Sequence, residues 1–199
     1  KLVPGTNGAP SKWVSYIVTT VPTTTAAAAP TRPSTDNTGT LVDNGDGTYK
    51  YTFYRDITKI KDDVAAMSVS GANKADLGDL TYNAALTHRV TIQFSGNAPG
   101  TGNNTPTGVT NVTGVPLTKP VDAIYDFIPA TGQAVAASGR DIVANAKCEE
   151  CHRKLGGIPG DTASSSAAGF HGGSRNEVRY CVVCHTDQRK FGRTEATIN

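Results

Sequence analysis

Several residue types that often reveal a function class are scarce in this sequence. No apolar run approaches the roughly 18 residues that a membrane-spanning helix needs, so we expect no transmembrane segment. Only 18% of the residues are charged and the formal net charge is +2, which argues neither for an anionic membrane surface nor for nucleic acid, and we expect no nucleic-acid partner. The 199 residues include one methionine, four cysteines and four histidines. The positions of these few residues therefore carry most of the functional information.

All four cysteines lie in two copies of one pentapeptide pattern, C-x-x-C-H. The first copy spans residues 148–152 and the second spans residues 181–185. This pattern attaches c-type haem, because its two thiols bond to the porphyrin vinyl groups and its histidine ligates the iron. We therefore predict two covalently attached c-type haems. The thioethers would come from Cys148, Cys151, Cys181 and Cys184, and the proximal iron ligands would be His152 and His185.

Two other uses of paired cysteines remain open. Two C-x-x-C pairs can hold one structural zinc ion through four thiolates, and each pair can also form a redox-active dithiol. Both alternatives leave unexplained why a histidine follows the second cysteine in each copy. Since the chain has only four histidines, their recurrence at this position favours haem.

The second axial ligand decides whether each iron transfers electrons or stays open to other ligands. The single methionine, Met67, cannot serve two irons, so histidine is expected. His171 lies in the segment Gly-Phe-His-Gly-Gly, whose glycines allow the backbone to approach a flat macrocycle closely. We therefore predict His171 as a distal iron ligand, and the alternative is a solvated loop histidine.

His88 is the candidate for the other distal ligand. In the alternating run that begins at Thr87, it shares a strand face with Val90, Ile92 and Phe94. Two bis-histidine haems need four histidines, which is the number present. The alternative is a packed and hydrogen-bonded core histidine at the end of an apolar strand face.

The composition divides the chain near residue 139. Residues 1–139 are rich in Thr, Gly, Ala and Pro, and their short β-patterned runs predict a mainly β fold, a split barrel or a sandwich-like domain. The predicted strands cover residues 13–18, 48–54, 65–70, 87–95 and 123–128, a turn covers 43–47, and no segment shows a helical period. Residues 140–199 are predicted as a small, mostly irregular or helical dihaem segment, with a helical stretch at 142–147 and haem in place of an apolar core.

The order of the motifs resembles a known family. A β-patterned run at 46–53 precedes the first C-x-x-C-H, then Phe170-His171-Gly172-Gly173, then the second C-x-x-C-H. This order is similar to the N-terminal part of the OmcA/MtrC family of outer-membrane multihaem c-type cytochromes. The resemblance implies a split β-barrel followed by closely packed bis-histidine haems. It also implies that His171 ligates the haem on Cys148 and Cys151. Relatives usually carry ten haems, so the chain is a fragment, or other material or His88 supplies the second distal ligand.

The resemblance also implies a function and a location. It predicts electron transfer to metal oxides, soluble metals or flavins outside the cell, with other multihaem cytochromes or neighbouring subunits as partners. C-type haem is attached after export, so we expect the bacterial cell surface, the outer membrane, the extracellular space or the periplasm. The chain is then an electron-transfer protein and not an enzyme. A dihaem enzyme with one open iron and a zinc-stabilised extracellular binding domain are the alternatives.

Basic residues are frequent near the second motif. They are Arg175, Arg179, Arg189, Lys190 and Arg193. Their positive charge suits haem propionates or an acidic partner, and an ordinary solvated face is the alternative for each of them.

Overall fold

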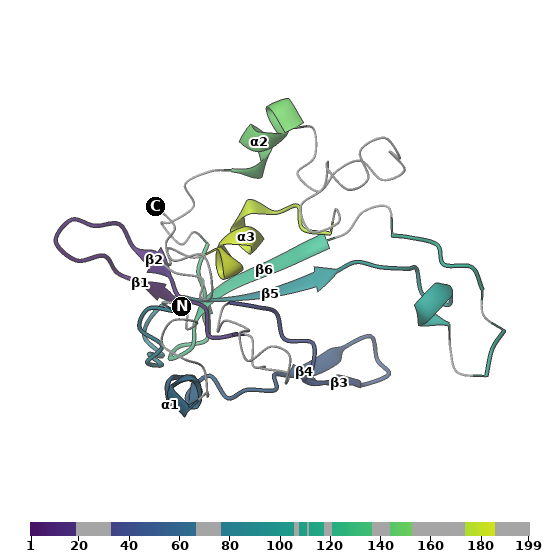
Figure 1. The fold of residues 1–199 in the computed structure, drawn as a ribbon, viewed down its shortest axis with the longest axis horizontal. Coiled ribbons are helices and arrows are strands. Elements are labelled where there is room, and N and C mark those ends of the chain that lie inside the picture. The colour runs from purple at the N-terminus through teal and green to yellow at the C-terminus, as the bar shows by residue number, and fades with distance from the viewer. Residues whose placement is uncertain are drawn as a thin grey trace. The chain divides into compact units, whose positions relative to one another are not determined.

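The chain divides into two compact units. The computed structural model describes residues 1–18, 33–66, 77–105, 108–110, 112–117, 121–136, 144–152 and 174–185, with the backbone alone at Asn104, Cys148, Cys151 and His152 (Figure 1). Unit 1 consists of residues 1–88, 127–140 and 182–199, and unit 2 consists of residues 89–126 and 141–181. The division predicted at residues 139 and 140 stays a prediction.

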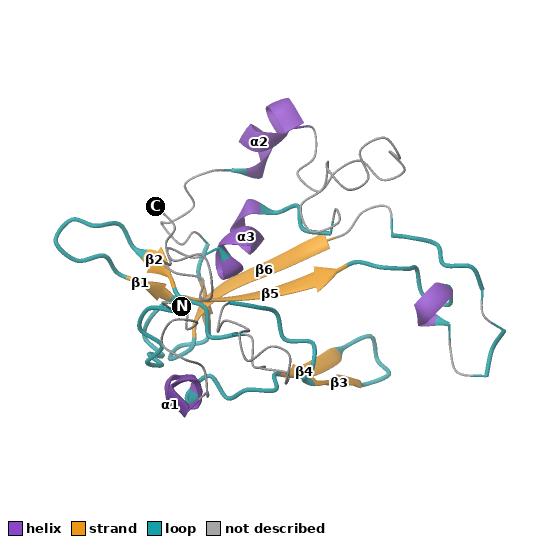
Figure 2. Cartoon of the chain, viewed as in Figure 1, coloured by secondary structure: helices purple, strands orange, loops and turns teal. Residues whose placement is uncertain are grey.

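The described residues are mainly β, as the sequence predicted (Figure 2). The strands are β1 (Leu2–Val3), β2 (Lys12–Trp13), β3 (Thr40–Asp43), β4 (Tyr49–Thr52), β5 (His88–Phe94), β6 (Val121–Ile128) and β7 (Gln133–Ala134). The helices are α1 (Ile60–Ala66), the short 3-10 helix η2 (Gly102–Asn104), α2 (Asn145–His152) and α3 (Val178–Cys184). Strands pair as β1-β2, β3-β4 and β5-β6-β7, so the described strands form three small sheets and no closed barrel.

The hairpin of β3 and β4 confirms the predicted turn and strand. Asp43 is opposite Tyr49, and the turn between them places Gly45 and Gly47 at φ of 76° and 88°. Glycine adopts such positive φ values without the steric penalty of a Cβ atom. The Asp46 carboxylate accepts a hydrogen bond from the Thr48 amide at 2.9 Å, which closes the turn.

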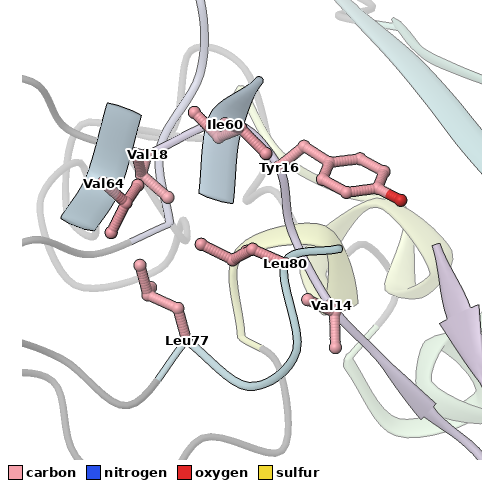
Figure 3. Close-up of a cluster of buried hydrophobic side chains, with 7 residues drawn as sticks. All are labelled: Val14, Tyr16, Val18, Ile60, Val64, Leu77 and Leu80. Atoms are coloured by element: carbon pink, nitrogen blue, oxygen red, sulfur yellow. The ribbon is translucent and has the colours of Figure 1, made fainter. Parts of the chain in front are cut away.

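An apolar cluster forms the core of unit 1. Ile60 and Val64 lie one turn apart on α1, so both side chains point to the same side of the helix. Figure 3 shows Val64 beside Val18, with the side chains of Leu77 and Leu80 directed toward them. The cluster consists of Val14, Tyr16, Val18, Ile60, Val64, Leu77 and Leu80.

Two predictions for unit 1 were wrong in part. The strand expected over 65–70 is wrong at residues 65 and 66, which end α1, and residues 67–70 lie outside the described residues. Asp62 and Asp63 in the first turn suit the positive end of a helix. Of the strand expected over 13–18, only Trp13 lies in β2, and Val18 forms an isolated bridge with Pro33. Residues 13–16 are all buried, so this segment packs on both sides and does not alternate.

Strands β5 and β6 confirm the runs predicted at 87–95 and 123–128. The apolar side of β5 is not a core along its whole length, because Ile92 and Phe94 are 50% and 55% exposed. The polar residues that alternate with them contact the segment around α3, as the next section describes. None of the helices in the described part of the chain is long and apolar enough to cross a lipid bilayer.

Candidate haem-binding helices

Both C-x-x-C-H motifs lie on short helices. The cysteines and histidine of the first motif are all within α2, and the cysteines of the second motif are within α3. Cysteines three residues apart on a helix lie on the same face, about 5–6 Å apart at Cβ. In α3 this spacing places Cys181 and Cys184 on one face of the helix. The helix predicted at 142–147 is confirmed over 145–147, and residues 142 and 143 lie outside the described residues.

The two cysteines of α3 are partly buried and form no disulfide within the described part of the chain. The Cys181 thiol donates to the Glu177 carbonyl at 3.3 Å, and the Cys184 thiol donates to the Ser34 carbonyl at 3.7 Å. Burial, and then the carboxylates of Asp122 and Glu177, raise the pKa of the Cys181 thiol. This cysteine is therefore protonated at neutral pH. Where side chains are described, no group of three or more His, Cys, Asp or Glu gathers around a metal position.

A buried carboxylate connects α3 to β5 and β6. Asp126 accepts hydrogen bonds from Arg89 Nε and Nη2, both at 2.7 Å, and from Arg179 Nη2 at 2.8 Å. Arg89 Nη1 also donates to the Arg179 carbonyl at 3.0 Å. The side chains of Arg89 and Asp126 are 1% and 0% exposed. These charge-assisted bonds hold the first turn of α3 against the two strands (Figure 1).

A second set of contacts holds the segment before α3 on β5. Arg175 Nε donates to Gln93 Oε1 at 3.0 Å, and the Tyr180 hydroxyl lies 3.4 Å from the same oxygen. The Arg175 guanidinium also lies 5.7 Å from the centroid of the Tyr180 ring. Arg175 and Arg179 thus bind residues of their own chain, whereas Arg189, Lys190 and Arg193 lie outside the described residues.

The starts of α2 and α3 are joined by one side chain. Asn145 Oδ1 accepts a hydrogen bond from the Val178 amide at 2.9 Å, and Asn145 Nδ2 donates to the Asn176 carbonyl at 2.6 Å. The Asn176 amide donates in turn to Asp122 Oδ2 on β6 at 2.8 Å. Both haem-motif helices therefore begin at the same point on unit 2.

His88 lies in an aromatic cluster of unit 1. Its side chain stacks on Tyr16 at 5.5 Å between ring centroids, and the rings of Tyr82 and Phe127 are tilted against it. Its Nδ1 is 2.8 Å from the Leu86 carbonyl, an arrangement that suits donation by Nδ1–H and leaves the lone pair on Nε2. Burial is the main cause that lowers the pKa of His88.

The environment of His88 Nε2 bears on its predicted role. This nitrogen is buried and has no hydrogen-bond partner within the described part of the chain. A lone-pair nitrogen of this kind is what an iron ligand requires. The ligand role of His88 stays a prediction, and His171 lies outside the described residues.

Sequence reasoning missed three residues that organise the site: Arg89, Asp126 and Asn145. Arg89 and Asp126 are charged residues inside β-patterned runs, which is a signal for a buried pair. Their pairing spans 37 residues of sequence, so the partner of each could not be read from local pattern. Asn145 directly precedes the first motif region and resembles a helix cap, but the sequence does not show that it caps a different helix.

Comparisons with known proteins agree with this picture. Residues 140–199 match the family model for the outer membrane cytochrome MtrC/MtrF-like, domains II/IV. The chain is 33% identical over 148 residues to the multiheme cytochrome MtrC of Shewanella baltica (strain OS185), which is 74% of this chain and 16% of that protein.

The fold has a solved counterpart. The chain matches the crystal structure of the outer membrane decaheme cytochrome OmcA with a TM-score of 0.52 and 22% identity, over 99% of this chain and 24% of that one. At this identity the likeness shows the fold alone. The chain spans a minor part of both matched proteins. Sequence and fold together show that this chain resembles the OmcA/MtrC-family multihaem cytochromes.

Proposed function

We propose that this chain is an electron-transfer module that binds two c-type haems. The observation that supports it most directly is α3, which carries Cys181 and Cys184 three residues apart on one helix face and is followed at once by His185. Helix α2 repeats the same sequence pattern with Cys148, Cys151 and His152. A bound haem would supply a ferric/ferrous iron couple at each motif.

The chain's own residues would hold and tune these groups. The four cysteines form the thioethers, and His152 and His185 are the proximal iron ligands. His171 is the distal ligand for the haem on Cys148 and Cys151, and His88 is the candidate for the other iron. Two histidines on each iron exclude further ligands, which favours electron transfer over substrate chemistry.

We place this activity outside the cytoplasm, at the outer membrane or cell surface or in the periplasm. The names of the matched proteins, both multihaem cytochromes and one of them an outer-membrane protein, support this location. The partners would be other multihaem cytochromes or neighbouring subunits, and the terminal acceptors would be metal oxides or flavins.

The test is an absorption spectrum of the purified protein, oxidised and reduced, with a pyridine haemochrome assay. Two covalent haems per chain with low-spin bands are expected. A high-spin component would show an open iron and favour the dihaem enzyme. Zinc in place of haem would overturn the proposal and favour the extracellular binding domain.

A further inference from the structure

The hydrogen bonds of the two haem-motif helices converge on Asn145. It is the first residue of α2, and its carboxamide bonds to the two residues that bracket the start of α3. The first amides of any helix lack partners within the helix, and side-chain oxygens commonly supply them. Here the cap comes from the other haem-motif helix, because Asn145 Oδ1 accepts from Val178, the first residue of α3.

The contact joins equivalent positions of the two motifs. Asn145 precedes Cys148 by three residues, and Val178 precedes Cys181 by three residues. With a rise of about 1.5 Å per residue, each first cysteine is about 4.5 Å along its helix from the contact. A change at the contact would therefore move both attachment positions relative to each other.

The contact is also fixed to the sheet of unit 2. The Asn176 amide donates to Asp122 Oδ2 on β6, and its carbonyl accepts from Asn145. The first turn of α3 is held by Asp126, which lies on the same strand and accepts a hydrogen bond from Arg179. The starts of both helices are thus anchored to strand β6 as well as to each other.

We propose that Asn145 is a positioning residue that sets the separation and orientation of the two haem-bearing helices, and through them the coupling between the two haems. This inference rests on the proposed function. A carboxamide supplies one acceptor and one donor at once, which this contact uses. Aspartate keeps only the acceptor, and leucine has the same branching at Cγ but keeps neither. Electron tunnelling falls steeply with separation, so the side chain that sets the separation also sets the rate.

The experiment uses the haem-loaded protein and three variants. Asn145→Leu removes both bonds, Asn145→Asp keeps the acceptor, and Asn44→Leu is the control. Asn44 donates its side-chain amide to Thr48 Oγ1 at 3.0 Å in the β3–β4 turn of unit 1, and so is also a hydrogen-bonded asparagine. Electron paramagnetic resonance measures the magnetic interaction between the two ferric irons, and hydrogen exchange measures protection of the Val178 amide.

We expect Asn145→Leu to shift the interaction between the irons and to speed exchange at Val178 on the order of fivefold. Asn145→Asp should keep the protection of Val178 and shift the interaction less, and Asn44→Leu should match wild type in both. An unshifted interaction in Asn145→Leu overturns the inference. If that variant does not fold, Asn145→Asp decides: a wild-type interaction overturns the inference and a shifted one supports it. Wild type without two haems would instead defeat the proposed function.

Discussion

Each unit of this chain is stabilised internally by a different kind of contact. Among the described residues, every buried hydrophobic side chain except Tyr180 belongs to unit 1. In unit 2, the first part of α3, Val178 to Cys181, is held by the carboxylate of Asp126, two arginines and the amide of Gln93. Apolar burial is the main source of folding free energy, whereas buried polar bonds mainly fix geometry.

The difference indicates what each unit contributes. Unit 1 has an apolar core of its own, and α1 closes it with Ile60 and Val64. Unit 2 has little buried apolar surface among its described residues and leaves Ile92, Phe94 and Tyr125 half exposed. A haem-binding unit can use the porphyrin as its apolar core, so its protein contacts are free to position the attachment helices. The predictions below test this contrast, from the largest expected effect to the smallest.

Removing the carboxylate in unit 2 should have the largest effect. Asp126→Ala leaves the buried guanidinium of Arg89 without its partner, which should cost about 3–5 kcal/mol in the free energy of unfolding. Urea unfolding of the haem-loaded protein measures this cost. The matched control is Asp56→Ala, since Asp56 forms an exposed ion pair with Lys59 at 3.8 Å.

A double variant distinguishes the effect of the Arg89–Asp126 pair on the position of α3 from its effect on the free energy of unfolding. Arg89→Met with Asp126→Leu replaces both charges, and we expect it to recover most of the stability that Asp126→Ala loses. The double variant should still lose the alignment of α3, seen as a changed spectrum of the second haem. If the double variant is as unstable as the single one, the pair stabilises unit 2 and the contrast between the units fails.

Unit 1 should respond to loss of volume instead of charge. The Ile60 side chain is fully buried (0% exposed), so Ile60→Ala should cost about 2–5 kcal/mol and Ile60→Val about 0.5–1.5 kcal/mol. Neither variant should change the spectrum of the haem on Cys148 and Cys151, because Ile60 lies within the apolar cluster of unit 1 and that motif belongs to unit 2. A shifted spectrum of this haem in Ile60→Val would contradict the separation of roles.

Sequence predicted the features that are formed by residues close together in the chain, and it missed those that depend on distant residues. The turn at 43–47 and the strands β4, β5 and β6 depend on residues close in sequence, and all were found where expected. Helix α1 was missed because seven residues are too few to show a helical period against a β-patterned background. The bond between Arg179 and Asp126 spans 53 residues, so only the folded chain shows it.

His88 is both a buried residue of unit 1 and a predicted iron ligand. If it ligates the second iron, His88→Phe should convert that haem to high spin, while the aromatic cluster keeps its packing. His171→Ala should convert the other haem in the same way and serves as the comparison. Absorption and electron paramagnetic resonance spectra report both changes. A low-spin second haem in His88→Phe would show that His88 only packs against Tyr16, Tyr82 and Phe127.

The smallest expected effect is an acid sensitivity that belongs to unit 1. Four Asp-x-Thr turns recur among its described residues. In each turn the carboxylate accepts a hydrogen bond at 2.9 Å from the amide two residues on; the turns begin at Asp36, Asp46, Asp56 and Asp79. The side chain and then the amide of Thr48 lower the pKa of Asp46 from its ordinary 3.8. Thr58 lowers the pKa of Asp56 in the same way.

A carboxylate whose pKa is lowered by folding binds its proton more readily in the unfolded chain. Its contribution to stability is therefore complete above the unfolded pKa near 3.8 and is lost as the pH falls through the lower folded value. Wild type should lose unfolding free energy below about pH 4. Asp46→Asn with Asp56→Asn keeps the acceptor oxygens but cannot titrate, so its urea midpoint should fall less over the same range. Solvent screens these exposed turns, so the difference should be small, and an equal fall in the variant would place the acid sensitivity outside these two turns.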